Sequence, residues 1–471
     1  MDTERSRKII YWLLPLAGMA FCLWYVKSAT CDVVYSDYIR LVNSYLPDVY
    51  NPRKFFVPDV LTRIPINYLC RIINVEFFGF SVTLERVLGV ISLGLAGWIF
   101  AAYCRRRSIG CLWFALLMAV MFSLNKWEML TNGSGWSHFL AFACFYYHEL
   151  ALDRVWAGEE KKHDRLKLLL LPWFIILGTA GPYCAIYAAT LLLSYGFCMV
   201  ARRREPGGAG VWDRRYLAYM ACVLIPLLLY MLSNSFAVEE HSGATGRSLA
   251  AILSENPTFP VRFLLKSFAG ILVGGEELQR FMELGLLGNK TCYMLGLLVV
   301  CGYGLALWLN FRFRLYEKTV MPLMLLAGGG MNHVLIFLSR YIFEKEDYAL
   351  SSRYALQFQV GILGIILTFA LVWGLKERAV KGYQWIMALF CLAILMGNGY
   401  TTYRELKKAP SREEKFEEKA LLAREIPFMT KEEIKENGVK LGDVFEYHKG
   451  ADKIQDAFKI LEEHNLNVFH K

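Results

Sequence analysis

Residues 9–26 read IIYWLLPLAGMAFCLWYV, a run of eighteen side chains that contains no charge. A helix of this length spans the roughly 30 Å hydrocarbon core of a lipid bilayer. No small-residue cleavage site follows the run, so we expect a retained membrane helix and not a removed signal peptide.

Similar runs recur along the 471 residues, of which 56% are hydrophobic. Backbone polar groups in lipid must be satisfied within their own segment, which favours helices. The sequence therefore predicts an all-α polytopic membrane protein with about eleven transmembrane helices. We place them at residues 9–27, 86–104, 109–125, 134–152, 166–180, 183–201, 215–233, 291–311, 319–340, 354–375 and 383–400.

The net charge of +10 is distributed over short loops and does not form one nucleic-acid-binding segment. Basic residues cluster between alternate spans, at Arg5, Arg7, Lys8; Arg105, Arg106, Arg107; Lys161, Lys162, Arg165; Arg202, Arg203, Arg204; Arg312, Arg314, Lys318; and Lys376, Arg378, Lys381. Such loops are typical of the cytoplasmic side. We therefore expect a cytoplasmic N-terminus, an extracytoplasmic C-terminus and no nucleic-acid partner.

Three long segments are expected on the extracytoplasmic side. The first outer loop, residues 28–85, contains an amphipathic stretch at 64–75, and the fourth, residues 234–290, contains another at 259–273. Each pattern predicts a helix in the membrane interface. Residues 401–471 predict a small, charged, helical tail, separate from a transmembrane domain over 1–400, with breaks at Pro410 and Pro427.

Two acids, Asp32 and Asp37, follow the first span within a dozen residues. A carboxylate at the outer mouth of a helix bundle is a plausible general base, because partial desolvation makes it a better proton acceptor. The alternative is a solvated loop acid.

The second outer loop carries Glu128, and His138 falls just inside the next span. Ionisable groups at membrane depth indicate a functional site, although a structural histidine fits equally well. His333, after Gly328-Gly329-Gly330, either bonds a neighbouring helix or lines a cavity.

Arg353 enters the tenth span from outside, with Gln357 one turn deeper on the same helix face. An arginine at the headgroup level can hold a lipid phosphate through two hydrogen bonds. The competing interpretation is an interface arginine that extends its charge to water.

These polar residues together resemble those of the GT-C superfamily of polyprenyl-phosphate-sugar-dependent membrane glycosyltransferases. The Tyr35-Ser36-Asp37-Tyr38 segment is similar to the acidic site of the first outer loop, and Ser352-Arg353-Tyr354 is similar to an arginine-tyrosine element before a late span. Most members have adjacent acids, whereas serine precedes Asp37, so the choice between Asp37 and Asp32 stays open.

The resemblance implies transfer of a sugar from a polyprenyl-phosphate donor to a cell-envelope glycan or lipid acceptor, with inversion, at a bacterial inner membrane. It implies Asp37 or Asp32 as the catalytic base and Arg353, Arg340 and Tyr354 at the donor phosphate. Glu128, His138 and Gln357 would orient the acceptor or support the base. Membrane lipids are further expected partners. No cofactor is indicated with certainty, and a divalent metal stays open.

Two other functions fit the same topology. A polysaccharide polymerase or ligase would use Arg247, Arg262 and Arg353 without needing Asp37. A lipid or glycan flippase would place ionisable groups near the bilayer centre, where His333 is the one candidate that the sequence offers.

Overall fold

The computed structural model describes residues 2–52, 64–203, 213–234, 244–375 and 380–470. Within these residues it contains helices and irregular segments and no strand. The predicted all-α class is confirmed.

Eight helical segments among the described residues are long and apolar enough to cross a bilayer. They contain α1 (Asp2–Ala29), α4 (Val82–Arg106), α9 (Cys184–Arg203), α10 (Arg214–Asn234), α14 (Asn289–Arg312), α15 (Met321–Arg340), α16 (Ala355–Trp373) and α17 (Lys381–Glu425). The chain is therefore a multi-pass helical membrane protein. The most apolar window of α16 is 94% buried, against 28% for α1, so α16 lies in the middle of the bundle.

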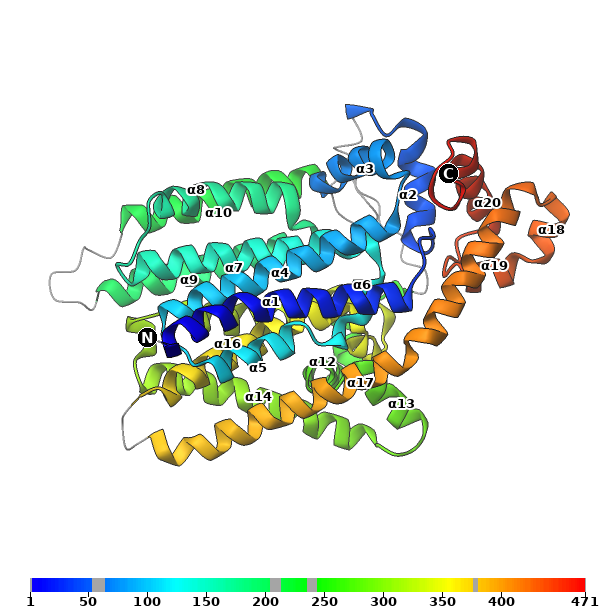
Figure 1. Ribbon diagram of the computed structural model, residues 1–471. Coiled ribbons are helices and arrows are strands. Elements are labelled where there is room, and N and C mark those ends of the chain that lie inside the picture. The colour runs from blue at the N-terminus through cyan, green and yellow to red at the C-terminus, as the bar shows by residue number, and fades with distance from the viewer. Residues whose placement is uncertain (1, 53–63, 204–212, 235–243, 376–379, 471) are drawn as a thin grey trace.

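The other three expected spans coincide with α5 (Cys111–Met121), α7 (Trp136–Trp156) and α8 (Asp164–Phe174), which a π-helical turn at Ile175–Thr179 extends. Figure 1 shows these helices running alongside the eight longer ones. They are shorter or carry more charge than the eight, so their crossing of the membrane stays a prediction.

The predicted basic loops gather at the end of the bundle that holds the N-terminus. Arg7 Nη2 donates to the Ile109 carbonyl at 2.7 Å. Arg107 pairs with Asp153 at 3.1 Å, and Asp153 also accepts from the Thr319 hydroxyl at 2.6 Å. Of the predicted basic residues, Arg204, Lys376 and Arg378 lie outside the described part of the chain.

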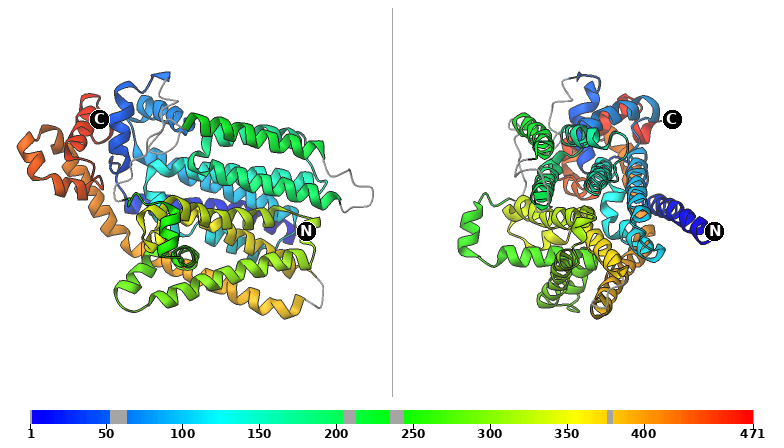
Figure 2. Two further views of the ribbon diagram at one scale, coloured as in Figure 1. Left: turned by 180° about the vertical axis from the view of Figure 1, so that it is seen from behind. Right: turned by 90° about the vertical axis from the view of Figure 1, so that its left-hand side faces the viewer.

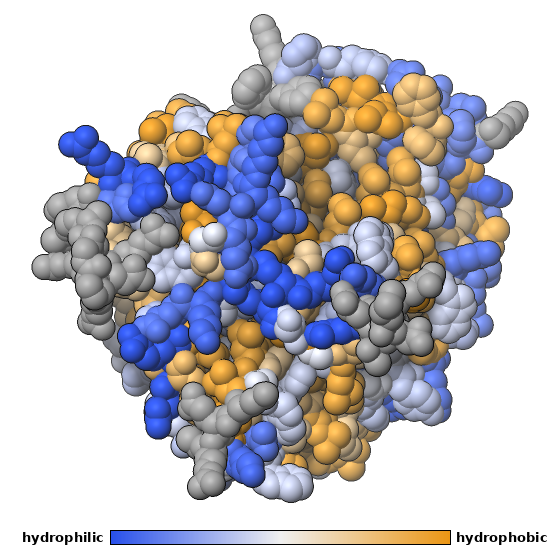
Figure 3. All heavy atoms as spheres, turned by 60° about the vertical axis from the view of Figure 1, so that its left-hand side comes forward, coloured by the Kyte–Doolittle hydropathy of each residue, from blue (hydrophilic) through white to orange (hydrophobic). Residues whose placement is uncertain are grey.

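The two described termini lie at opposite ends of the bundle (Figure 2). Figure 3, which brings the N-terminal end forward, shows hydrophilic side chains over that end and apolar side chains on its flanks. This distribution is what lipid-exposed flanks and a solvated end require.

The first outer loop and the C-terminal tail share one hydrophobic core. The loop contributes α2 (Asp37–Tyr45), and the tail contributes α18 (Lys431–Glu436), α19 (Gly438–Val444) and α20 (Ala451–Glu463). Buried side chains of both segments pack together, among them Ile39, Val42, Phe445, Phe458 and Leu461. Figure 1 shows α2 beside α20. The tail is thus joined to residues near the start of the chain.

Helix α17 runs without interruption through residue 400, where the sequence suggested a domain boundary, and through Pro410. The prediction of a helix break at Pro410 is wrong. Contacts on both sides of the proline hold the helix: Lys408 Nζ lies 2.5 Å from Glu277 Oε1, and the Arg412 guanidinium lies over the Trp127 ring.

The expected amphipathic helix of the first loop is present as α3 (Pro65–Phe78). Leu69, Ile73 and Phe77 are 48%, 50% and 76% exposed, whereas Asn67 and Arg71 are buried on the opposite side. Its apolar face therefore points away from the protein. The second expected helix is α12 (Phe259–Leu272), which Figure 1 shows nearly end-on, across the direction of the spans.

Candidate functional site

A cavity of about 670 Å³ has residues of α2 and α3 in its wall, and Figure 1 shows these helices at the end of the bundle opposite the N-terminus. Residues of α2, α3, α7, α15 and α16 line it, together with the turns that precede α16 and α9. Six of the eight predicted site residues are in its wall: Asp37, His138, Arg340, Arg353, Tyr354 and Gln357. Positions up to 320 residues apart in the chain are thus brought to one cavity.

Asp37 is the first residue of α2, where a negative side chain interacts favourably with the helix dipole. The preceding Ser36 has φ 53° and ψ −127°, a conformation that non-glycine residues rarely adopt. Ser36 is buried, and its backbone N–H donates to the Phe445 carbonyl at 2.7 Å. Backbone strain of this kind is typical of sites where the surrounding structure fixes a functional side chain.

Asp32 does not line the cavity; its carboxylate is bonded to the start of α4. It accepts hydrogen bonds from the Ser81 hydroxyl at 2.6 Å, the Val82 N–H at 2.7 Å and the Thr83 N–H at 3.2 Å. These contacts satisfy donors that the first turn of a helix leaves unpaired. Of the two candidate bases, Asp37 therefore fits the cavity better.

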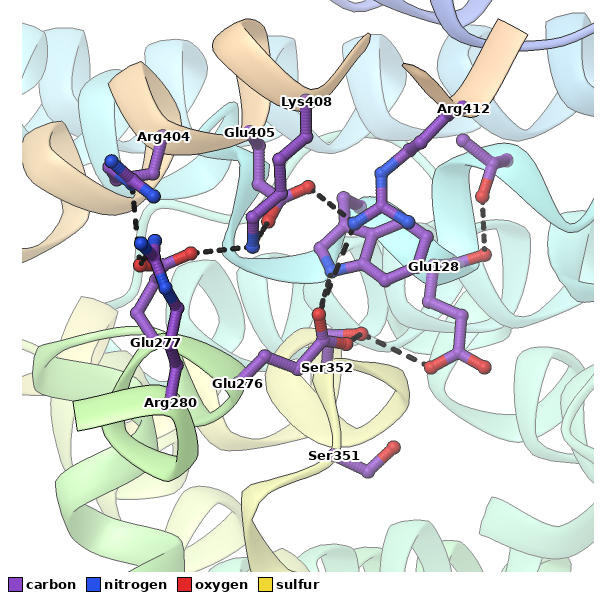
Figure 4. Close-up of polar contacts among 12 residues, drawn as sticks. Glu128, Glu276, Glu277, Arg280, Ser351, Ser352, Arg404, Glu405, Lys408 and Arg412 are labelled. Atoms are coloured by element: carbon purple, nitrogen blue, oxygen red, sulfur yellow. Dashed lines mark hydrogen bonds and ion pairs between the residues drawn. The ribbon is translucent and has the colours of Figure 1, made fainter. Parts of the chain in front are cut away.

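Glu128, in α6 (Trp127–Thr131), forms an ion pair with Arg353 just behind the cavity wall. The Ser352 hydroxyl lies 3.1 Å from Glu128 Oε2 and 3.0 Å from Glu276 Oε1 (Figure 4). The pair fixes the direction of the Arg353 side chain. In the structure Glu128 therefore holds the predicted phosphate-binding arginine.

A second arginine, Arg340, ends α15 and also faces the cavity. Its Nε donates to the Tyr354 hydroxyl at 2.7 Å, and its guanidinium lies 5.8 Å from the centre of that ring. Arg340 and Arg353 flank the turn between α15 and α16, so the segment that joins these helices contributes two cations to the cavity wall.

Tyr183 joins Gln357 and His138 in the cavity wall. Gln357 Nε2 donates to the Tyr183 hydroxyl at 2.9 Å, and the His138 ring meets the Tyr183 ring edge-on with their centres 4.9 Å apart. Tyr183 is not among the residues that the sequence predicts for the site. Its signal was the Gly181-Pro182 turn, which interrupts an apolar stretch and places the next side chain at the end of the bundle that holds the cavity.

One wall of the cavity is aliphatic. It comprises Leu335, Ile336 and Leu338 of α15 and Ile342 of the following turn. Leu338 is 49% exposed, so this wall continues onto the outer surface of a spanning helix. The cavity thus combines charged groups with an apolar side that reaches the lipid-facing surface.

A network of charged residues behind Glu128 connects α13 (Gly275–Glu283) to α17 (Figure 4). Lys408 Nζ of α17 lies 2.5 Å from Glu277 Oε1 of α13, and Trp127 Nε1 donates to Glu276 Oε2 at 3.0 Å. Burial raises the pKa of Glu276 to about 7, and the Glu405 carboxylate adds to the rise. The local sequence around Glu276 gives no indication of its partners on α17.

The residues on which the other two functions depend lie elsewhere. His333 is fully buried between the rings of Phe268 and Phe358, with centroids 3.8 Å and 4.1 Å away, and its Nδ1 lies 2.7 Å from Ser267 Oγ. Arg247 pairs with Glu255 and Glu344, and Arg262 pairs with Glu346. All three make packing or ion-pair contacts away from the cavity wall.

Among the described residues, no group of three His, Cys, Asp or Glu side chains is arranged to hold a metal ion. No protein-family model, curated protein or solved structure matches this chain. The cavity and its residues therefore carry the functional argument alone.

Proposed function

We propose that the protein is a GT-C-type glycosyltransferase that moves a sugar from a polyprenyl-phosphate donor to an envelope glycan or lipid acceptor. The observation that carries the proposal is the shared cavity, whose wall contains Asp37, Arg340 and Arg353 together with the aliphatic residues of α15. A carboxylate, two cations and an apolar surface are what such a donor requires.

The donor is an amphiphile with a phosphate between a long apolar tail and a sugar. The aliphatic residues of α15 suit the tail, because this wall reaches the surface of a spanning helix. Arginine is suited to the phosphate, since it stays charged when partly desolvated and donates two parallel hydrogen bonds. Glu128 supports this role by orienting Arg353.

In the proposed reaction Asp37 accepts the proton of an acceptor hydroxyl, while the hydroxyl oxygen attacks the anomeric carbon of the sugar. The bond between this carbon and the phosphate oxygen breaks on the opposite face, so the configuration inverts. The phosphate leaves with the electron pair, and Arg353 and Arg340 stabilise its charge. Gln357, His138 and Tyr354 shape the surrounding wall.

The proposal includes the finer topology expected from the sequence: about eleven spans, a cytoplasmic N-terminus and an extracytoplasmic cavity in a bacterial inner membrane. The gathering of basic loops at the end opposite the cavity supports this orientation. The outward apolar face of α3 supports a position for that helix at the membrane surface.

The test uses the full-length protein in lipid nanodiscs with a panel of undecaprenyl-phosphate hexoses that carry a label in the sugar. Asp37→Asn should reduce transfer by about 10²- to 10⁴-fold, as loss of a general base does, and should leave binding of undecaprenyl phosphate unchanged. Asp48→Asn, an exposed acid bonded to Asn51, is the matched control. Full activity of both Asp37→Asn and Asp32→Asn would contradict the proposal.

A further inference from the structure

The segment nearest the C-terminus lies against both ends of the first outer loop through one side chain, Asn467. Its Oδ1 accepts the Val34 N–H at 3.0 Å, and its Nδ2 donates to the Phe80 carbonyl at 3.1 Å and to Asp32 Oδ1 at 3.4 Å. Its own backbone N–H donates to the Gly79 carbonyl at 2.6 Å. Every polar group of the side chain is thus used to hold residues that lie beside the site.

The approach of the tail to the α3–α4 turn is close. Gly79 has φ +59°, and a Cβ added there would lie 2.3 Å from the His470 ring. Glycine is required for both reasons, because other residues rarely adopt this φ and the space is already filled. The turn and the tail therefore fit together as one packed unit.

The same tail also holds α2 at two further points. The Ser36 N–H donates to the Phe445 carbonyl, and Asn43 Nδ2 donates to the Lys453 carbonyl at 2.8 Å. Asp37 is therefore flanked in the chain, at residues 34, 36 and 43, by hydrogen bonds to the tail. Ser36 keeps its strained backbone within this arrangement.

We propose that Asn467 is a positioning residue, which fixes residues 32–37 and thereby sets the direction of the Asp37 carboxylate in the cavity. The inference rests on the proposed function in taking Asp37 as the base. The tail then acts on catalysis although none of its residues lines the cavity. The cations that would hold the donor belong to α15 and the turn before α16, and Arg353 pairs with Glu128 and Arg340 with Tyr354, neither of which is a residue of the tail.

A displaced base slows the transfer step without weakening donor binding, and a shift of about 1 Å can lower the rate 10²-fold. For Asn467→Ala we expect a kcat that is about 10- to 100-fold lower and a donor KM that is unchanged. Amides in residues 33–38 should exchange with deuterium faster, because the Val34 N–H loses its acceptor.

Asn465→Ala is the matched control. Asn465 has the same φ of 53° as Asn467, so alanine meets the same backbone penalty at both positions. Asn465 is exposed, and its side chain has no hydrogen bond among the described residues. A general weakening of the tail therefore changes exchange and kcat in both variants, whereas loss of the positioning hydrogen bonds changes them only in Asn467→Ala.

The experiment measures exchange and transfer on the full-length protein in nanodiscs with the undecaprenyl-phosphate hexose panel. Faster exchange at 33–38 and a lower kcat in Asn467→Ala alone support the inference. Equal deuterium exchange in the two variants, or an unchanged kcat in Asn467→Ala, overturns the inference about Asn467. The proposed function is retained in either case if the wild-type protein transfers the sugar. If the wild-type protein transfers no sugar but only Asn467→Ala shows faster deuterium exchange at residues 33–38, the proposed function is rejected. The result would still show that Asn467 fixes the loop.

Discussion

The guanidinium of Arg353 is ion-paired with the carboxylate of Glu128, 225 residues earlier in the chain. Arg353 is 42% exposed toward the cavity and Glu128 is 22% exposed, so the pair lies at the boundary between the cavity and the protein interior. The negative charge orients the arginine, and it also competes with any anion that binds there. The two side chains therefore predict opposite effects on phosphate binding.

Arg353→Gln should weaken binding of undecaprenyl phosphate about 10- to 100-fold, since a hydrogen bond to a charged group contributes about 1.5–3 kcal/mol. Glu128→Gln should tighten binding about fivefold, because glutamine keeps an oxygen acceptor that orients Arg353 and removes a competing charge of about 1 kcal/mol. Microscale binding assays in nanodiscs measure both. Arg262→Gln, whose side chain pairs with Glu346 outside the cavity wall, should not change the affinity. A loss of affinity in Glu128→Gln would contradict this account.

Asp32→Ala should lower the stability of the folded protein and leave its affinity for undecaprenyl phosphate unchanged. The substitution removes the acceptor of the Val82 and Thr83 N–H groups at the start of α4. Leaving such groups unpaired costs about 1–3 kcal/mol. Thermal unfolding should show a lower Tm, with an unchanged affinity for undecaprenyl phosphate. An unchanged Tm together with lost transfer would instead indicate that Asp32 is the base.

Glu276 predicts a pH dependence of stability. Its pKa is about 7 in the folded protein and near 4.5 ordinarily, so the folded state keeps a proton that the unfolded state releases. The resulting stabilisation is complete below about pH 4.5 and is lost as the pH rises to about 7. Glu276→Gln should remove this loss, so its Tm should vary less between pH 5 and pH 8.

The control for this effect is Glu283→Gln, an exposed residue at the end of the same helix. It should keep the pH profile of the wild type. The groups that face Glu276 are Trp127, Ser352, Arg412, Glu405 and Glu128. A Glu276→Gln profile equal to that of the wild type would assign the titration to another group.

The outward face of α3 predicts contact with lipid. A nitroxide at Ile73→Cys, in a Cys301→Ser background, should be more accessible to oxygen than to a water-soluble nickel chelate in nanodiscs, because oxygen concentrates in lipid. A label at Glu432→Cys, exposed on α18, should show the reverse order. Greater nickel accessibility at residue 73 would place the helix in water.

Local sequence was sufficient for the features that depend on local periodicity. Apolar length predicted the eight long spans, and the amphipathic pattern of residues 64–75 predicted the helix that became α3. Topology also placed Asp37, His138 and Arg353 on one side of the bundle, which is why they were candidates for a common site.

Features that depend on distant partners were not predictable in this way. Asp32 and Asp37 look alike in sequence. They are distinguished by the hydrogen bonds that Asp32 accepts from the start of α4. Asn467 carries no motif at all, and its role depends on residues more than 380 positions away. Pro410 indicated a break from local chemistry, while contacts with α13 and Trp127 determine the outcome.

The bond between Val34 and Asn467 spans 433 residues, and this separation bears on biosynthesis. At roughly 5–20 residues per second, about 20–90 s pass between synthesis of the two residues. During that interval the apolar side chains of the first outer loop, including Ile39 and Val42, lack the tail residues that bury them in the folded protein. Residues 401–470 therefore complete the packing of a loop that is synthesised long before them, and a ribosome that stalls within this segment leaves Asp37 without the contacts that hold its loop.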